Sequence, residues 1–223
     1  MIFEELEQSI RLLYPKCPIK RFKDVCIVSE AEPNATVKGL SFNIPESLLI
    51  GNELIKSLSG FFENSDRIFR KDCDGIVLLE YNGKSYCLLI ELKSAFDTKD
   101  IDKARKQILS TYIKLNMSLM PLADYNKDDF EFIGIIVSKE PTGDCLKWIR
   151  NINMLSDTDP KKKLYIFPIQ LYSEKQKVIH YDFYLREKGY RLSPNCMYEK
   201  MKYCHVAVPP DSSIYKADIA KFL

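Results

Sequence analysis

The chain has 223 residues, of which 46% are hydrophobic and 29% are charged, as is usual for a globular protein that buries a sizeable core. Its formal net charge is only +2, so any contact with phosphate groups has to come from local patches. The N-terminal residues are acidic and amphipathic, and no apolar run approaches the roughly 18 residues of a membrane span. We therefore expect a cytoplasmic protein with no membrane partner.

The cysteine and histidine content argues against two further classes. The seven cysteines are scattered without a CxxC pair, and the chain has two histidines, so neither a zinc site nor a disulfide framework is supported. An odd number of cysteines favours free thiols in a reducing compartment. There is no Gly-rich phosphate loop, so nothing in the sequence suggests an ATPase or a nucleotide cofactor.

Before residue 71 the apolar spacing predicts two helices and two strands. A short amphipathic helix is expected over residues 2–14 and a strand over 21–29. A second helix is predicted over 45–62, with Pro45 near its first turn. Residues 66–69 are expected to form the first strand of the core.

Residues 71–94 are predicted to form a β-hairpin, because two apolar runs flank the dipeptide Asn82-Gly83. Counting outward from a two-residue turn places Asp74 opposite Glu91, with Lys93 two residues further on the same face. Both faces are apolar in the middle, which indicates central strands that are covered on both sides. A longer turn or a bulge would shift this register and move Asp74 away from Glu91.

Two carboxylates this close destabilise a sheet unless they share a proton or hold a cation. Acidic oxygen ligands suit a hard cation such as Mg²⁺ or Mn²⁺. A neighbouring lysine can orient a water molecule or stabilise charge that develops on a phosphate. The alternative is a solvated salt bridge between Glu91 and Lys93, which contributes about 0–1 kcal/mol.

Asp74, the hairpin and the run Glu91-Leu92-Lys93 together resemble the PD-(D/E)XK nuclease superfamily, which includes Holliday-junction resolvases and Mrr-like and RecB-like nucleases. The resemblance covers roughly residues 45–140. It implies a three-layer α/β/α restriction-endonuclease-like core with a mixed central sheet and helices on both faces. Asp74, Glu91 and the main-chain carbonyl of Leu92 would ligate Mg²⁺ or Mn²⁺, and Lys93 would act on the attacking water. Cys73 stands where the family often has proline.

The same resemblance suggests two further site residues. Members of the family often add a helix glutamate from upstream of the hairpin, a position that Glu53 occupies in the predicted helix, although an exposed glutamate is the simpler interpretation. RecB-like members carry a glutamine followed by a tyrosine on the helix after the motif. Gln107 and Tyr112 look similar, with a spacing one residue longer, and Gln107 is expected near the metal or a phosphate. Tyr112 is expected in the core.

After the hairpin, apolar residues at helical spacing predict a helix over 99–117. Its other face groups Lys103, Gln107, Ser110 and Lys114, and its basic residues either bind phosphate or form a solvated face. A buried strand is expected over 130–138, reached by this helical crossover.

The remainder of the chain is predicted to add a helix and further strands. The helix is expected over 143–155, and Lys161, Lys162 and Lys163 form either a phosphate-binding patch or a solvated turn. A hairpin is predicted from 164–172 and 178–185. An edge strand over 201–208 and a short terminal helix would follow.

These observations predict one nuclease-like α/β domain over 1–223, with an N-terminal extension over 1–44, a core over about 45–140 and a β-rich addition over about 160–223. The expected function is divalent-metal-dependent hydrolysis of phosphodiester bonds, with DNA favoured over RNA as the partner. A non-catalytic nucleic-acid-binding or assembly module and an RNA-directed nuclease are the alternatives. By analogy with the family, the protein would act as a homodimer or with a protein partner, for instance in a restriction or anti-phage system.

Overall fold

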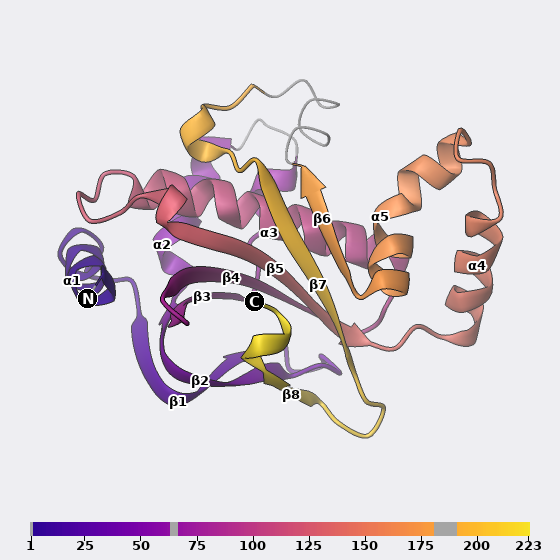
Figure 1. The fold of residues 1–223 in the computed structure, drawn as a ribbon, viewed down its shortest axis with the longest axis horizontal. Coiled ribbons are helices and arrows are strands. Elements are labelled where there is room, and N and C mark those ends of the chain that lie inside the picture. Colours follow the sequence, from indigo (N-terminus) through magenta and orange to yellow (C-terminus); the bar gives the residue numbers. More distant parts are fainter. Residues whose placement is uncertain (1, 63–66, 181–190) are drawn as a thin grey trace.

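Helices gather on one side of a strongly curved sheet in a computed structural model that describes residues 2–62, 67–180 and 191–223 (Figure 1). The α-helices are α1 (Ile2–Leu13), α2 (Glu53–Lys56), α3 (Thr98–Leu119), α4 (Gly143–Asn153) and α5 (Pro160–Glu174). The strands are β1 (Ile19–Ser29), β2 (Gly39–Ile50), β3 (Gly75–Tyr81), β4 (Lys84–Lys93), β5 (Phe130–Lys139), β6 (Gln176–His180), β7 (Lys200–Val208) and β8 (Ile214–Asp218). The short 3-10 helices are η1 (Ser57–Phe62), η2 (Arg67–Arg70), η3 (Lys127–Asp129), η4 (Pro194–Cys196) and η5 (Ile219–Lys221).

The described strands form one mixed sheet in the order β1-β2-β3-β4-β5-β7-β6, with β8 paired to β2. Strands β1, β2, β3 and β4 are antiparallel to one another in this order, whereas β4, β5 and β7 run parallel; β8 is parallel to β2, and β6 is antiparallel to β7. Helix α3 makes the crossover from β4 to β5, as the sequence predicts.

The predicted hairpin is confirmed in its turn and in its register as far as Gly75, while Asp74, predicted opposite Glu91, lies directly before the paired residues of β3. Asn82 and Gly83 both have positive φ, at 51° and 73°, as a two-residue turn of type I′ requires. From Tyr81 opposite Lys84, the pairing continues without a shift to Gly75 opposite Ile90.

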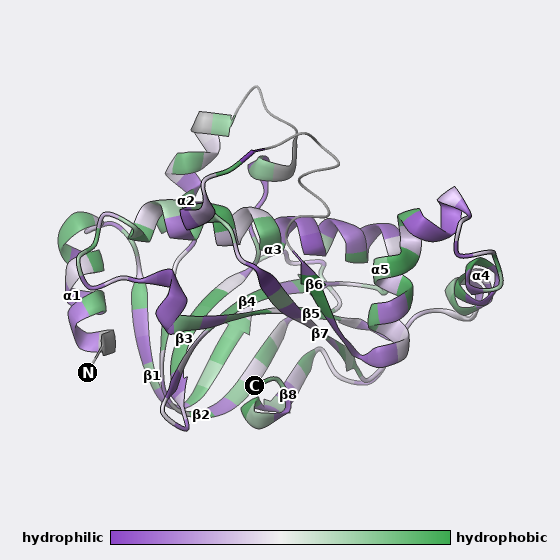
Figure 2. Ribbon diagram, turned by 45° about the horizontal axis from the view of Figure 1, so that its top comes forward, coloured by the Kyte–Doolittle hydropathy of each residue, from purple (hydrophilic) through white to green (hydrophobic). Residues whose placement is uncertain are grey.

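Each face of the hairpin packs into a separate hydrophobic core, and the division of side chains between the faces is the predicted one. The first core contains Ile76 and Leu89 together with side chains from α1 to α5. The second contains Val77 and Leu88 with side chains from the other strands and the C-terminal segment. Figure 2 shows the hydrophobic residues concentrated along these strands. Because the helices of the described residues cover the first core, the three-layer arrangement is not confirmed.

The second face is covered because the β1–β2 ribbon bends over it. The β1–β2 register shifts between Lys23 and Asp24, so Pro45 is an extra residue in β2, and Asp24 has φ of 74°. Such a bulge bends a strand pair and needs no amide donor from its extra residue, so proline is tolerated there. Past the bend, Val28 lies against Gly75, where an added Cβ would fall 2.5 Å from Val28 Cγ1. Gly75 therefore permits the close approach of the ribbon.

The helix predicted over 45–62 is wrong in its first third. Residues up to Ile50 belong to β2, of which residues 47–50 pair with both β1 and β3, and the helical part begins at Glu53 and is short. Leucines at helical spacing also suit a strand that is covered on both faces, and the ladder partners on either side decided the outcome.

Three further predictions need correction. Residues 67–69 lie in the 3-10 helix η2 and not in a strand, while residue 66 lies outside the described residues. Residues 164–172 lie in α5, whose start is capped by Asp159, which accepts from Lys161 N at 2.8 Å, with Pro160 in the first turn. The second strand of this predicted hairpin was expected over 178–185. Its first residues, 178–180, lie in β6, which pairs with β7 and not with residues 164–172. Residues 181–185 lie outside the described residues.

The C-terminal region also differs in its layout. Strand β7 lies between β5 and β6 and is therefore internal, not an edge strand. Strand β8 was not predicted, and the terminal helix is a single 3-10 turn. Because α5 lies within it, the region from residue 160 onward is not purely β-rich.

The predicted helices over 2–14, 99–117 and 143–155 and the strands over 21–29 and 130–138 are confirmed within a few residues at each end. None of the described helices has the length and apolar character needed to cross a membrane.

Candidate active site

Asp74 lies at the open end of the hairpin, directly before β3, and forms hydrogen bonds with both neighbours of Glu91. Its backbone N–H donates to Ile90 O at 2.8 Å, and its Oδ2 accepts from Leu92 N at 2.7 Å. The carboxylate thus takes a position in the ladder that a backbone carbonyl would otherwise fill. Burial raises the pKa of Asp74 to about 6, although the Leu92 bond opposes this shift.

Glu91 is the most deeply buried acidic residue of the hairpin, with 2% of its surface exposed. Its Oε1 accepts from Lys93 Nζ, while its Oε2 is buried without a hydrogen-bond partner. Burial and the charge of Asp74 raise the pKa of Glu91 to about 8, and the Lys93 ammonium offsets only part of this shift. An unpaired buried carboxylate oxygen is costly and indicates a position for a cation or a proton.

Gln107 fixes the position of Lys93. Its Oε1 accepts from Lys93 Nζ at 2.9 Å, and its Nε2 donates to Asp72 O at 3.0 Å. Because the Gln107 amide nitrogen donates to the Asp72 carbonyl, the Gln107 amide oxygen faces Lys93. The ammonium is therefore held between a carboxylate and an amide, and the Lys93 side chain is 13% exposed.

Further along α3, two residues hold the segment that leads into Asp74. Thr111 Oγ1 accepts from Cys73 N at 2.9 Å. Lys114, which is fully buried, forms an ion pair with Asp72 and donates to Phe69 O at 3.1 Å. Lys114 was expected on a solvated or phosphate-binding face of this helix, and its burial contradicts both alternatives. Its spacing of seven residues from Gln107 places both on the face of α3 that covers the site.

Two acidic residues near the site were missed. Glu30 and Glu32 lie in the loop between β1 and β2, and their charges raise the pKa of Asp74. The same loop reaches the end of β4, where Thr36 Oγ1 donates to Ser94 O at 2.6 Å. Only the bend in the β1–β2 ribbon brings this loop to the site, so no local sequence signal could have identified it.

Within the described residues, no interaction brings Glu53 to the other predicted site residues. It is an exposed residue at the start of α2, where it forms an ion pair with Lys56 at 3.6 Å. Its neighbour Asn52 instead contacts the hairpin, with Nδ2 donating to Cys73 O at 2.7 Å. Tyr112 is buried against Phe132, as expected for a core residue.

The residues at the end of the hairpin fit a divalent cation in their chemistry. Asp74 and Glu91 supply carboxylate oxygens, and the carbonyl of Leu92 lies on the side of β4 that faces Asp74, since the N–H and C=O of one strand residue point to the same neighbour. Within the described ranges, no group of three or more acidic, histidine or cysteine side chains is arranged to hold a metal. A cation here would therefore keep most of its positions for water and substrate, as Mg²⁺ does.

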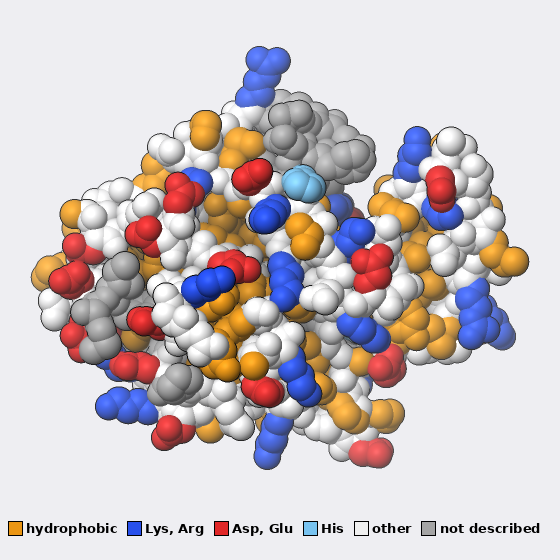
Figure 3. Space-filling model, in the orientation of Figure 1, with side chains coloured by type: hydrophobic (Ala, Val, Ile, Leu, Met, Phe, Trp, Pro, Cys, Tyr) orange, Lys and Arg blue, Asp and Glu red, His pale blue; other side chains and the backbone are white. Residues whose placement is uncertain are grey.

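The concavities found among the described residues lie away from these side chains. A groove of about 1030 Å³ runs past Gly83, Lys84 and Lys200, at the turn end of the hairpin, and its lining carries both charge signs. On the face of the molecule drawn in Figure 3, lysines and acidic residues are intermixed with hydrophobic side chains. Size alone would favour this groove, but the paired buried charges lie at the other end of β4.

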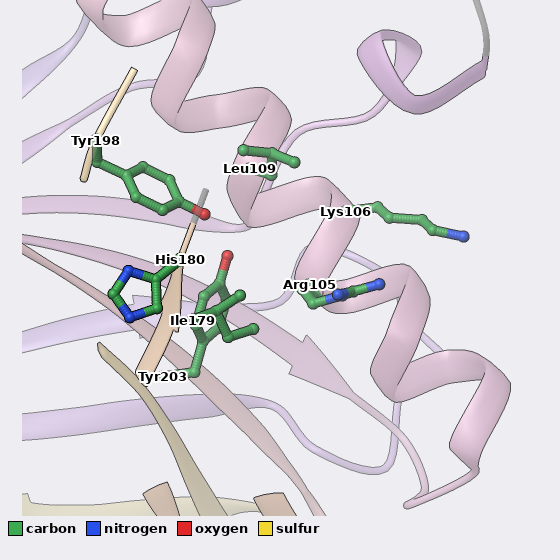
Figure 4. A pocket seen from close by; sticks show the side chains of 7 residues that line it. All are labelled: Arg105, Lys106, Leu109, Ile179, His180, Tyr198 and Tyr203. Atoms are coloured by element: carbon green, nitrogen blue, oxygen red, sulfur yellow. The ribbon is translucent and has the colours of Figure 1, made fainter. Parts of the chain in front are cut away.

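A small cavity of about 10 Å³ separates α3 from β6 and β7 (Figure 4). The lining residues are Arg105, Lys106, Leu109, Ile179, His180, Tyr198 and Tyr203. Lys106 points away from the ring of His180, and the volume is that of about one water molecule. This cavity is too small for an organic ligand.

The chain matches no family model, no curated protein and no solved structure in any of the three comparisons.

Proposed function

We propose that the protein is a divalent-metal-dependent nuclease that hydrolyses phosphodiester bonds, most readily in DNA, with a site that resembles that of the PD-(D/E)XK superfamily. The observation that carries this proposal is the end of the hairpin. There Asp74 hydrogen-bonds to both neighbours of Glu91, Glu91 keeps one buried oxygen unpaired, and Lys93 is held beside it by Gln107.

The residues at the end of the hairpin would have three separate roles in this reaction. Asp74 and Glu91, with the carbonyl of Leu92, would hold Mg²⁺ or Mn²⁺, which supplies Lewis acidity and lowers the pKa of water. Lys93 presents an ammonium group that can position the attacking water and stabilise charge on the phosphate. Gln107 fixes the direction of that ammonium and touches no substrate itself in this arrangement.

The connectivity from the hairpin onward supports the same proposal. Helix α3 leads from the β3–β4 hairpin to the parallel strand β5 as expected, whereas the strand expected at 66–69 is replaced by η2 in its described residues, and β2 pairs with β3 instead. The site residues lie on β4, on α3 and directly before β3, so rigid elements hold them.

The test is a nuclease assay on plasmid, linear duplex, single-stranded DNA and RNA with Mg²⁺, Mn²⁺ or EDTA. We expect metal-dependent cleavage by the wild type and none by Asp74→Ala or Lys93→Ala, with both variants folded by circular dichroism. Full activity in either variant would overturn the assignment, and the preferred substrate decides between a DNA-directed and an RNA-directed enzyme.

A non-catalytic nucleic-acid-binding module is separated from an enzyme by metal binding. Calorimetric titration with Mn²⁺ should give binding that is lost in Glu91→Ala if the site works as proposed. Absence of both cleavage and Mn²⁺ binding in the wild type would favour the binding module.

A further inference from the structure

Two lysines beside the site have no carboxylate partner among the residues that the structure describes. Lys71 and Lys103 are exposed, and their side chains come into contact with each other. In the part of the chain that the structure describes, no ion pair joins either of them to an acidic residue. Two other lysines of α3 do have acidic partners, because Lys106 pairs with Asp102 at 2.8 Å and Lys114 pairs with Asp72.

The hydrogen bonds of Gln107 place this lysine pair next to Lys93. Lys103 is four residues before Gln107 and so lies on the same face of α3. Lys71 directly precedes Asp72, whose carbonyl accepts from Gln107 Nε2 at 3.0 Å. The charges of Lys93 and Glu91 also act on Lys71. The side chains of Lys71 and Lys103 therefore lie on the side of Gln107 where Lys93 is held.

Bringing two ammonium groups together is unfavourable unless an anion lies between them. Contact with Lys103 lowers the pKa of Lys71, which is the expected response to a like charge at this distance. A phosphate group carries negative charge on several oxygens and can accept from both lysines at once. Bound phosphate would remove the repulsion that the free protein carries.

We propose that Lys71 and Lys103 form a binding site for a phosphate group of a nucleic-acid backbone, adjacent to the Glu91–Lys93 pair. The site takes a phosphodiester next to the one that is cleaved and so sets the register of the strand. This inference deepens the nuclease proposal and rests on it for the identity of the ligand, while the anion site itself rests on the two lysines.

The experiment compares Lys71→Gln/Lys103→Gln with Lys84→Gln/Lys200→Gln. Both variants lose two positive charges from exposed lysines. The second pair lines the large groove at the other end of the hairpin, and Lys84 is about 30 Å along β4 from Lys93, given about 3.3 Å per residue. Labelled single-stranded and duplex oligonucleotides are titrated in EDTA, without cleavage, at several salt concentrations.

We expect Lys71→Gln/Lys103→Gln to bind more weakly and to reduce the slope of log K against log salt by about 0.9 for duplex or about 0.7 for single-stranded DNA, which is the loss of one phosphate contact. Lys71→Arg/Lys103→Arg should retain the wild-type slope. Inorganic phosphate should shift the lysine NMR signals of Lys71 and Lys103 in the wild type, whereas chloride at equal ionic strength should not. A shift with phosphate but unchanged oligonucleotide binding would identify a free-anion site and overturn the nucleic-acid assignment.

Other outcomes separate this inference from the nuclease proposal. A wild-type slope in Lys71→Gln/Lys103→Gln, or a loss confined to Lys84→Gln/Lys200→Gln, overturns the lysine site while leaving cleavage by the wild type to stand. Weakened binding in the lysine variant together with no cleavage by the wild type would support the phosphate site and overturn the nuclease assignment.

Discussion

The Asp74 carboxylate accepts from the backbone amide of Leu92 at 2.7 Å, and Leu92 is the residue that separates Glu91 from Lys93. One acidic side chain is thereby fixed to the strand that carries the other two site residues. Its orientation does not depend on a flexible rotamer, since the hydrogen bond locks the side chain to the sheet. The hairpin thus holds the candidate site ready before any ligand binds.

The first prediction follows from this bond. Asp74→Asn keeps an oxygen that can accept from Leu92 N but removes the charge. We expect a melting temperature close to that of the wild type and a cleavage rate lower by roughly 100-fold or more, because the site loses a charged ligand. Asp144→Asn, in the exposed first turn of α4, serves as the control and should cleave normally. Normal cleavage by Asp74→Asn would remove Asp74 from the mechanism.

The second prediction concerns Gln107. Gln107→Leu leaves Lys93 and the carbonyl of Asp72 without their shared partner, so the free energy of unfolding should fall by about 1–3 kcal/mol. Activity should fall through kcat more than through KM, because Lys93 loses its orientation. Gln107→Glu keeps an acceptor for Lys93 and should recover part of the rate. Urea denaturation and steady-state kinetics measure the two effects, and an unchanged kcat in Gln107→Leu would contradict the positioning role.

The third prediction concerns the buried ion pair between Lys114 and Asp72. Lys114→Met leaves the Asp72 carboxylate largely buried without a counter-charge, and this should destabilise the fold by about 3–5 kcal/mol. Adding Asp72→Asn should restore much of the loss, which a double-mutant cycle in urea measures. Lys147→Met, which breaks an exposed pair on α4, is the control and should change stability little. Equal losses of unfolding free energy in Lys114→Met and Lys147→Met would show that the buried pair stabilises the fold no more than the exposed pair does.

The fourth prediction is a pH dependence of stability without metal. Burial and Asp74 raise the pKa of Glu91 from 4.5 to about 8, so the folded state binds more protons than the unfolded state between these values. The stability that this group contributes is therefore fully present below about pH 4.5 and is lost as the pH rises toward 8. Relative to Glu91→Gln, the wild type should lose up to about 1.4 kcal/mol per pH unit in this window. Denaturation in urea with EDTA at pH 5 to 8 provides the measurement, and parallel curves for the two proteins would contradict it.

The hairpin and its charged end could be predicted from the sequence because the information is local. A two-residue turn fixes the register, and alternation of side chains then assigns every residue to a face. The crossover helix and the parallel strand that follows could be predicted for a similar reason, since each shows its own periodicity. Gln107 was found by its spacing on α3 and by resemblance to a known family.

The rest was decided by contacts between segments far apart in the chain. Residues 45–50 have a pattern that suits either helix or strand, and pairing with β1 and β3 made them strand. The bend at Pro45 folds the β1–β2 ribbon over the second core and brings Glu30 to Asp74. Lys114 looked solvated on a helix rich in charge, but it is buried because Asp72 supplies a partner 42 positions earlier in the chain. Local sequence patterns therefore determined which positions of the chain carry the candidate site residues. Burial and pairing between distant segments depend on the whole fold, and they determined which residues surround that site.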